Sequence, residues 1–106
     1  MSKYLLAVNY TLDGIRGLRS EGGSVRVAAA TSLVESAGGS LESIYFAFGE
    51  TDVYVIAEFP DEVSAAAAAL AVSAGGGATA RTTVLLSAEQ VDAAAQKETT
   101  YRPPGS

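Results

Sequence analysis

The chain of 106 residues contains neither cysteine nor histidine. Without cysteine, disulfides, thiolate nucleophiles and zinc–thiolate sites are excluded. Without histidine, the usual imidazole base and the most common metal and haem ligand are missing. A metal would need an all-oxygen site, and the carboxylates do not follow the spacing of a calcium-binding loop. We therefore expect no metal and no cofactor.

Positive charge and long apolar runs are also scarce. Seven Lys and Arg residues against twelve Asp and Glu residues give a net charge of −5, which repels phosphate backbones, so we expect no nucleic-acid partner. No apolar run approaches the roughly 18 residues of a membrane span, so we expect no membrane segment. The N-terminus enters a strand-like segment without a signal-peptide pattern, which indicates a cytoplasmic protein.

The length of 106 residues and the hydrophobic content of 48% predict one small globular domain with one core. Alternating side chains predict strands at 3–10 and 78–86 and a hairpin over 41–59. Helical spacing predicts a short helical turn after residue 11 and helices at 24–37, from 61 to the glycines at 75–77, and from 87 to about 97. Two prolines make residues 99–106 an extended tail, so we place the domain at 1–98.

This order of elements, β-α-β-β-α-β followed by a helix, predicts an α+β protein with the ferredoxin-like fold. In that fold a four-stranded antiparallel sheet carries both main helices on one face.

The hairpin Leu41–Phe59 separates two kinds of surface. With Glu50 and Thr51 as a two-residue loop and Gly49 supplying a positive φ, we expect three apolar pairs on the core side. These pairs are Phe48 with Val53, Phe46 with Val55 and Ile44 with Ala57. The other side carries Tyr45, Ala47, Asp52, Tyr54, Ile56 and Glu58, which is typical of a pocket or a subunit contact.

Two helices can cover only one face of the sheet. The opposite face, which we call the open face, is rich in apolar side chains for a soluble monomer. It gathers Leu5, Ala7, Asn9, Tyr45, Ala47, Tyr54, Ile56, Arg81 and Leu85. The simplest cover is a second copy laid sheet to sheet, so we predict a homodimer of the dimeric α/β-barrel type, or a larger homo-oligomer.

Several motifs occur in one order along the whole chain. They include Glu21-Gly22-Gly23-Ser24-x-Arg26, Tyr45-Phe46-Ala47-Phe48-Gly49, Thr82-Thr83-Val84-Leu85-Leu86 and Tyr101-Arg102-Pro103-Pro104-Gly105. With these motifs the chain resembles the GYD domain family, small proteins of the dimeric α/β-barrel type, and the resemblance implies that fold. Thr51 stands where the tyrosine of the family's Gly-x-Tyr-Asp turn would be. If that tyrosine binds a ligand in relatives, this chain cannot make the same interaction; if it only packs over the turn, little changes.

The candidate catalytic residues are Asp52 and Glu58, which share a strand face with Tyr54. Either carboxylate could act as a general base if burial in an apolar cavity raised its pKa. Alternatively, Asp52 accepts backbone hydrogen bonds in its turn and Glu58 lies at the rim of the sheet.

The candidate ligand-binding residues are Tyr10, Arg26, Tyr45, Tyr54 and Arg81. The tyrosines could form an aromatic pocket with hydroxyl groups, or simply pack. Arg26, at the start of a helix, needs a partner such as Glu21, Asp52 or a ligand carboxylate. Arg81 lies on the open face, where Glu58 of either subunit could pair with it.

Three functions fit these features. The favoured one is a domain that binds a small molecule between the sheet and a partner subunit, without a cofactor. The second is a cofactor-independent enzyme of the monooxygenase or isomerase type with a carboxylate base. The third is a purely structural role in assembly. Whether the protein is an enzyme is left open by the sequence.

Overall fold

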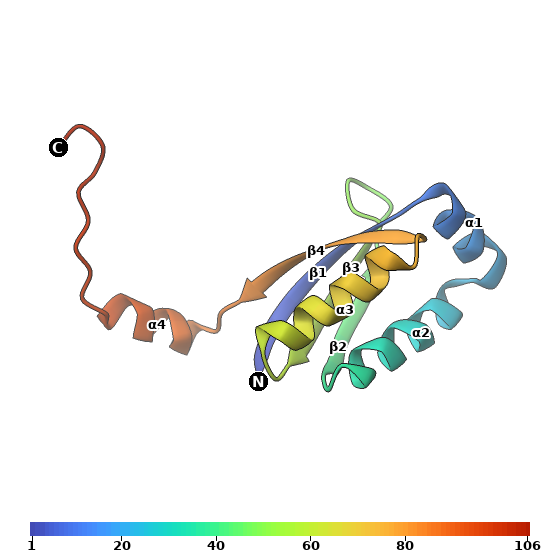
Figure 1. Cartoon of the computed structure of the whole chain (residues 1–106), viewed down its shortest axis with the longest axis horizontal. Coiled ribbons are helices and arrows are strands. Elements are labelled where there is room, and N and C mark those ends of the chain that lie inside the picture. The colour runs from blue at the N-terminus through green and yellow to red at the C-terminus, as the bar shows by residue number, and fades with distance from the viewer.

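The computed structural model describes all 106 residues and contains four strands and four helices (Figure 1). In chain order they are β1 (Ser2–Tyr10), α1 (Leu12–Glu21), α2 (Gly23–Ser36), β2 (Ser40–Phe46), β3 (Val53–Phe59), α3 (Glu62–Ala74), β4 (Ala78–Leu85) and α4 (Ala88–Gln96).

The four strands form one antiparallel sheet in the order β2-β3-β1-β4. This confirms the predicted α+β, ferredoxin-like fold with an additional C-terminal helix. Leu6 lies opposite Val55 on β3 and opposite Thr82 on β4, so the side chains predicted to share a face do share it. The edge strand β2 has an irregularity in its pairing between Leu41 and Ser43.

The core lies between the sheet and the helices α2 and α3, on one face only. The buried cluster joins the even-numbered residues of β1 and the odd-numbered residues of β3 to Val34 of α2 and to two alanines of α3. Its members are Tyr4, Leu6, Val34, Val53, Val55, Ala57, Phe59, Ala65 and Ala68. The alanines bring α3 close to the sheet because they have no long side chain.

Three of the four predicted helix starts are confirmed by side-chain caps. The Thr11 hydroxyl accepts a hydrogen bond from the Gly14 N–H, and the Asp61 carboxylate accepts one from the Ser64 N–H. Ser87 and Gln90 form a complete capping box at the start of α4. Each cap satisfies backbone donors that the first turn of a helix leaves free.

The predicted register of the hairpin is wrong by two residues. Phe46 lies opposite Val53 and Ile44 opposite Val55, so residues 47–52 form a longer loop. A shift of two keeps every strand side chain on its face, but Phe48 leaves the core and is 57% exposed. Phe48, not Gly49, has the positive φ, 53°.

The loop is long because the end of β1 holds residues 50–52. The Asp52 N–H donates to the Val8 carbonyl at 3.0 Å, and its carboxylate accepts from the Tyr10 N–H at 2.9 Å. The Asn9 side-chain amide donates to the Glu50 carbonyl at 2.9 Å. These bonds to β1 replace the tight hairpin turn.

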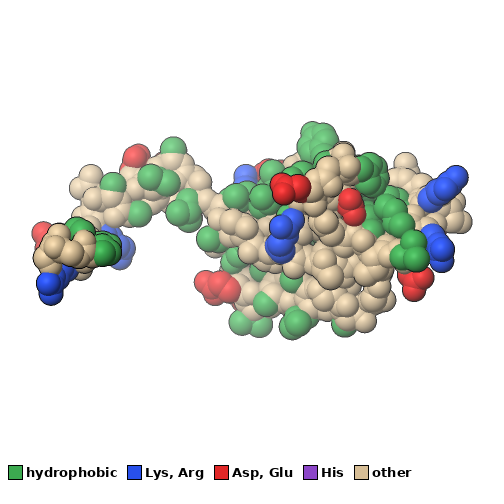
Figure 2. Space-filling view, turned by 90° about the horizontal axis from the view of Figure 1, so that it is seen from above, with side chains coloured by type: hydrophobic (Ala, Val, Ile, Leu, Met, Phe, Trp, Pro, Cys, Tyr) green, Lys and Arg blue, Asp and Glu red, His purple; other side chains and the backbone are tan.

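The chain beyond β4 leaves the body of the protein (Figure 1, Figure 2). We call residues 86–106 the arm; it consists of α4 and a tail without helix or strand. Every residue of the arm is exposed. None of the helices is both long and apolar enough to span a membrane.

Candidate functional site

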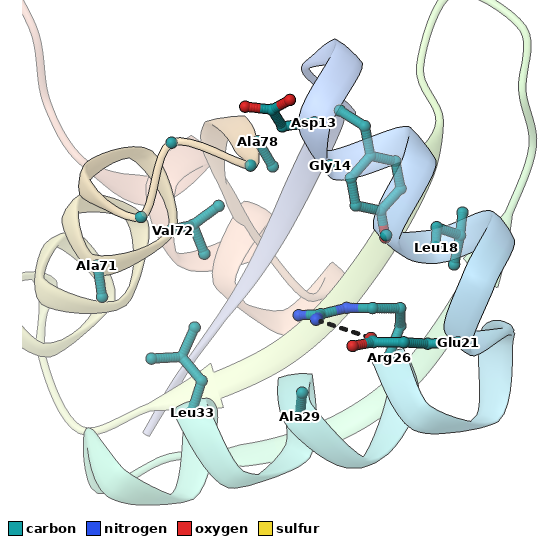
Figure 3. Close-up of a pocket in the computed structure, with 15 residues that line it drawn as sticks. Asp13, Gly14, Leu18, Glu21, Arg26, Ala29, Leu33, Ala71, Val72 and Ala78 are labelled. Atoms are coloured by element: carbon teal, nitrogen blue, oxygen red, sulfur yellow. Dashed lines mark ion pairs between the residues drawn. The ribbon is translucent and has the colours of Figure 1, made fainter.

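A cavity of about 540 Å³ opens on the helical side of the sheet (Figure 3). Its walls come from α1, α2, the C-terminal part of α3 and the glycines that lead into β4. The volume falls within the roughly 300–1,000 Å³ of small-molecule sites. The lining residues are Tyr10, Asp13, Gly14, Gly17, Leu18, Glu21, Arg26, Ala29, Leu33, Ala71, Val72, Gly75, Gly76, Gly77 and Ala78.

Arg26 supplies the positive charge of this cavity. It lies in the first turns of α2 and points between α1 and α2, where its Nη1 atom is 3.7 Å from the Glu21 Oε2 atom (Figure 3). Both side chains are about half exposed, and such a pair contributes little stability. A guanidinium has five N–H donors, so most of its donor capacity is available to a ligand.

The cavity continues inward as an apolar pocket of about 110 Å³. This inner pocket lies between α2, α3 and the sheet, and it shares Tyr10, Arg26 and Leu33 with the outer cavity. Its deeper wall is made of Leu6, Val8, Val34, Ile44, Val53, Val55 and Ala68. The site therefore has a charged mouth and an apolar interior.

Tyr10 stands at the boundary between the two parts. It is the last residue of β1 and lines both the outer cavity and the inner pocket. Burial raises the pKa of the Tyr10 hydroxyl, whereas the nearby Arg26 charge acts in the opposite sense. A tyrosine hydroxyl is protonated at neutral pH even at its ordinary pKa of about 10, so the Tyr10 hydroxyl can donate a hydrogen bond to a ligand.

Glycines allow two backbones to meet at the rim of the cavity. The Thr11 N–H donates to the Gly77 carbonyl and its hydroxyl donates to the Gly76 carbonyl, both at 2.9 Å. A Cβ atom on Gly14 would lie only 1.7 Å from the Gly77 carbonyl oxygen. Gly14 is therefore required for the close contact between α1 and the turn before β4.

The predicted ligand-binding residues divide between the two faces of the sheet. Tyr10 and Arg26 are together in the cavity. Tyr45, Tyr54 and Arg81 form one row across the open face, because Tyr45 is opposite Tyr54 and Ala7 is opposite both Tyr54 and Arg81. The three tyrosines therefore do not line a single aromatic pocket, and the cavity that the chain itself forms is on the helical side.

Comparison with known proteins gives one result for this chain. The model of the GYD domain matches residues 4–95, which is most of its length. The chain belongs to the GYD domain family. No curated protein and no solved structure matches it.

The turn that contains Thr51 has a structural role in this GYD domain. Thr51 is buried, and its hydroxyl accepts a hydrogen bond from Arg81 Nη2 at 2.8 Å. Arg81 does not reach Glu58 of its own chain, because Arg81 lies in the row of Tyr54 and Glu58 lies opposite Lys3 at the other end of the sheet. Thr51 thus fixes Arg81 on the open face.

Neither candidate catalytic carboxylate of the GYD domain faces the cavity. Asp52 binds the backbone of Tyr10, and Glu58 lies beside Lys3, whose ammonium group pairs with Glu42 at 2.6 Å. The carboxylate of Asp52 thus accepts a backbone hydrogen bond, as in its alternative interpretation, but the donor lies on β1 and not in the turn of Asp52 itself. No cluster of three or more acidic side chains forms that could hold a metal ion.

Sequence reasoning missed two acidic residues of the cavity. Glu21 is predicted only as a partner of Arg26, and Asp13 is not among the predicted ligand-binding residues, yet both line the cavity. The available signal is their spacing: Asp13 and Glu21 lie eight residues apart, a little over two turns of helix, so their side chains fall within one broad face of α1. No local sequence pattern indicates that this face of α1 lies toward α2.

Proposed function

We propose that this GYD domain binds a small organic carboxylate in the helix-side cavity and catalyses no reaction there. The observation that carries the proposal is the convergence of Arg26 and Tyr10 where the outer cavity meets the apolar pocket. A guanidinium prefers a planar carboxylate. An aromatic or aliphatic body of the ligand would then enter the inner pocket, where burial of apolar surface favours binding.

Glu21 sets the selectivity of the site. In the free protein it partly neutralises Arg26 at 3.7 Å. A carboxylate ligand competes with Glu21 for the guanidinium. The net gain in binding free energy is therefore smaller than it would be for an unpaired arginine. Asp13 adds a second negative charge to the cavity wall. Di- and tricarboxylates are therefore expected to bind more weakly than monocarboxylates with an apolar body.

Replacing Arg26 with glutamine is expected to weaken carboxylate binding roughly tenfold or more, the effect of removing a hydrogen bond to a charged group. The measurement is isothermal titration with benzoate, phenylacetate and hexanoate, each against its neutral amide. Arg19→Gln is the matched control, because Arg19 is exposed on α1 and does not line the cavity. Equal affinity for acids and amides, or equal losses in both variants, would contradict the proposal.

We further propose that two copies pair through their open faces, which agrees with the predicted homodimer. The centre of this face is apolar: Leu5 lies opposite Ile56, and Ala7 lies next along the strand. Tyr45 and Tyr54 are exposed beside them. Lys3, Glu42, Glu58 and Arg81 form a charged margin around this centre, which is the usual composition of a protein interface.

Placing a charge at the centre of this face is expected to dissociate the pair. Ile56→Glu buries an unpaired carboxylate in the interface, so the dissociation constant should rise by about tenfold or more. Sedimentation equilibrium at micromolar concentration measures it. Leu12→Glu is the control, because Leu12 is exposed on α1, away from the open face. A wild-type protein of monomeric mass at these concentrations would refute this pairing.

A further inference from the structure

The arm contains a helix that is not packed against the body of its own chain. All of its residues are exposed, including Leu86, Val91 and Tyr101. It extends the molecule to a radius of gyration of 16.7 Å, compared with about 13 Å for a compact chain of this length. Figure 2 shows it as a separate projection that carries hydrophobic side chains.

The helix of the arm, α4, has the features of a helix that packs on another surface. At nine residues, α4 is shorter than the roughly 12–15 residues that an isolated helix needs to be stable in water. It nevertheless has a complete capping box from Ser87 and Gln90. Ala88, Val91 and Ala95 recur at three- and four-residue spacing and form an apolar stripe, with Ala94 beside it.

The outer face of α3 is the matching unpartnered surface. Its inner face packs on the sheet through Ala65 and Ala68. Its outer face is also apolar: Val63 is 76% exposed and Leu70 is 70% exposed, with Ala66, Ala67 and Ala74 exposed around them. A helix that is apolar all round is usually buried on all sides.

The arm cannot cover this surface within one chain. Only Leu86 and Ser87 separate β4 from α4, so the first residue of α4 lies within about 11 Å of the end of β4. A helix packed on the outer face of α3 is two layers away from the sheet, at roughly 10 Å for each layer. The occupant must therefore come from another molecule.

We propose that α4 of one copy packs antiparallel on the outer face of α3 of a second copy. Small side chains on both helices permit an interaxial distance of about 8 Å. In this orientation Lys97, at the end of α4, comes close to Asp61 and Glu62, at the start of α3. The exchange is reciprocal, because a two-fold axis gives each copy one arm and one receiving face.

A cysteine cross-link tests this contact, and the natural chain offers no competing thiol. A Val91→Cys chain is mixed with a differently tagged Leu70→Cys chain under mild oxidation. We expect a disulfide between the two chains at a rate at least tenfold above that of Val91→Cys mixed with Leu12→Cys. Leu12 is exposed on α1, so its variant reports random collision. Equal rates for the two mixtures would overturn the proposal.

Hydrogen exchange of the α4 amides gives an independent readout in the full chain. Protection of α4 should rise with protein concentration and fall by roughly tenfold in Leu70→Glu, without loss of protection in the sheet. Protection that does not depend on concentration would mean that the arm folds on its own chain, which overturns the proposal. The inference does not depend on the carboxylate site, and benzoate binding should be unchanged in Leu70→Glu.

Discussion

Phe59→Ala is expected to lower the free energy of unfolding by about 3–5 kcal/mol, the usual cost of removing a fully buried phenylalanine. Phe59 is 0% exposed and its ring meets that of Tyr4 edge to face, with centroids 5.8 Å apart. The substitution leaves a cavity at the centre of the core and removes this aromatic contact, which adds to the loss. Urea unfolding followed by circular dichroism measures the change.

Phe48→Ala is the matched control for this prediction. Phe48 is 57% exposed, and its ring only stacks on Phe46, with centroids 6.2 Å apart. We expect a loss below about 1 kcal/mol, because an exposed ring gives up little water on folding. Since the sequence predicts that Phe48 lies in the core, a loss as large as that of Phe59→Ala would show that Phe48 packs in the core after all.

Gly14→Ala is expected to destabilise the protein by about 3 kcal/mol, the upper end of the cost of overpacking. The new Cβ atom would lie 1.7 Å from the Gly77 carbonyl oxygen, and backbone cannot move aside as a flexible side chain can. Separation of α1 from the turn would also weaken the two hydrogen bonds that Thr11 makes to Gly76 and Gly77. Thermal and urea unfolding measure the loss.

Gly17→Ala should have the opposite sign. It lies in the same helix, and a Cβ atom there would have no neighbour within 4 Å. Alanine is favoured over glycine in a helix by about 0.8–1.0 kcal/mol, so the variant should be more stable than the wild type. Destabilisation by both substitutions would show that α1 as a whole tolerates no change, and the specific contact of Gly14 would lose its support.

The fold can be predicted because local and periodic signals agree along the chain. Alternation along β1 and β3 assigns each side chain to a face, and that assignment holds in the structure. The caps Thr11, Asp61 and Ser87 mark the helix starts within about one residue. Each of these signals depends only on residues close in sequence. The geometry of the local backbone sets the face of each strand side chain and the residue at which each helix starts.

The hairpin register depends on contacts between distant residues. Asp52 is held by Val8 and Tyr10, about forty residues earlier in the chain. No local pattern around Gly49 reports those bonds, and they outweigh the preference for a two-residue turn. Local reasoning consequently assigns Phe48 to the core, although its backbone adopts a left-handed conformation outside the ladder.

The candidate site can be predicted in part. Tyr10 and Arg26 are ligand-binding candidates from the sequence, and both line the cavity. Their grouping with Tyr45 and Tyr54 fails because Tyr10 is an even-numbered residue of β1 and faces the helices, whereas the other two face away. The cavity itself depends on how α1 is placed against the turn before β4, where Gly14 meets Gly77.

The irregular pairing between Leu41 and Ser43 has a consequence for strand addition at the β2 edge of the sheet. A regular outer strand exposes a row of free N–H and C=O groups, on which another strand can add and start a fibre. The break in β2 disturbs that row and increases the local twist. Growth by strand addition is thereby hindered along β2, which leaves side-chain surfaces as the route for the proposed pairing and favours a closed complex of fixed size over a fibre.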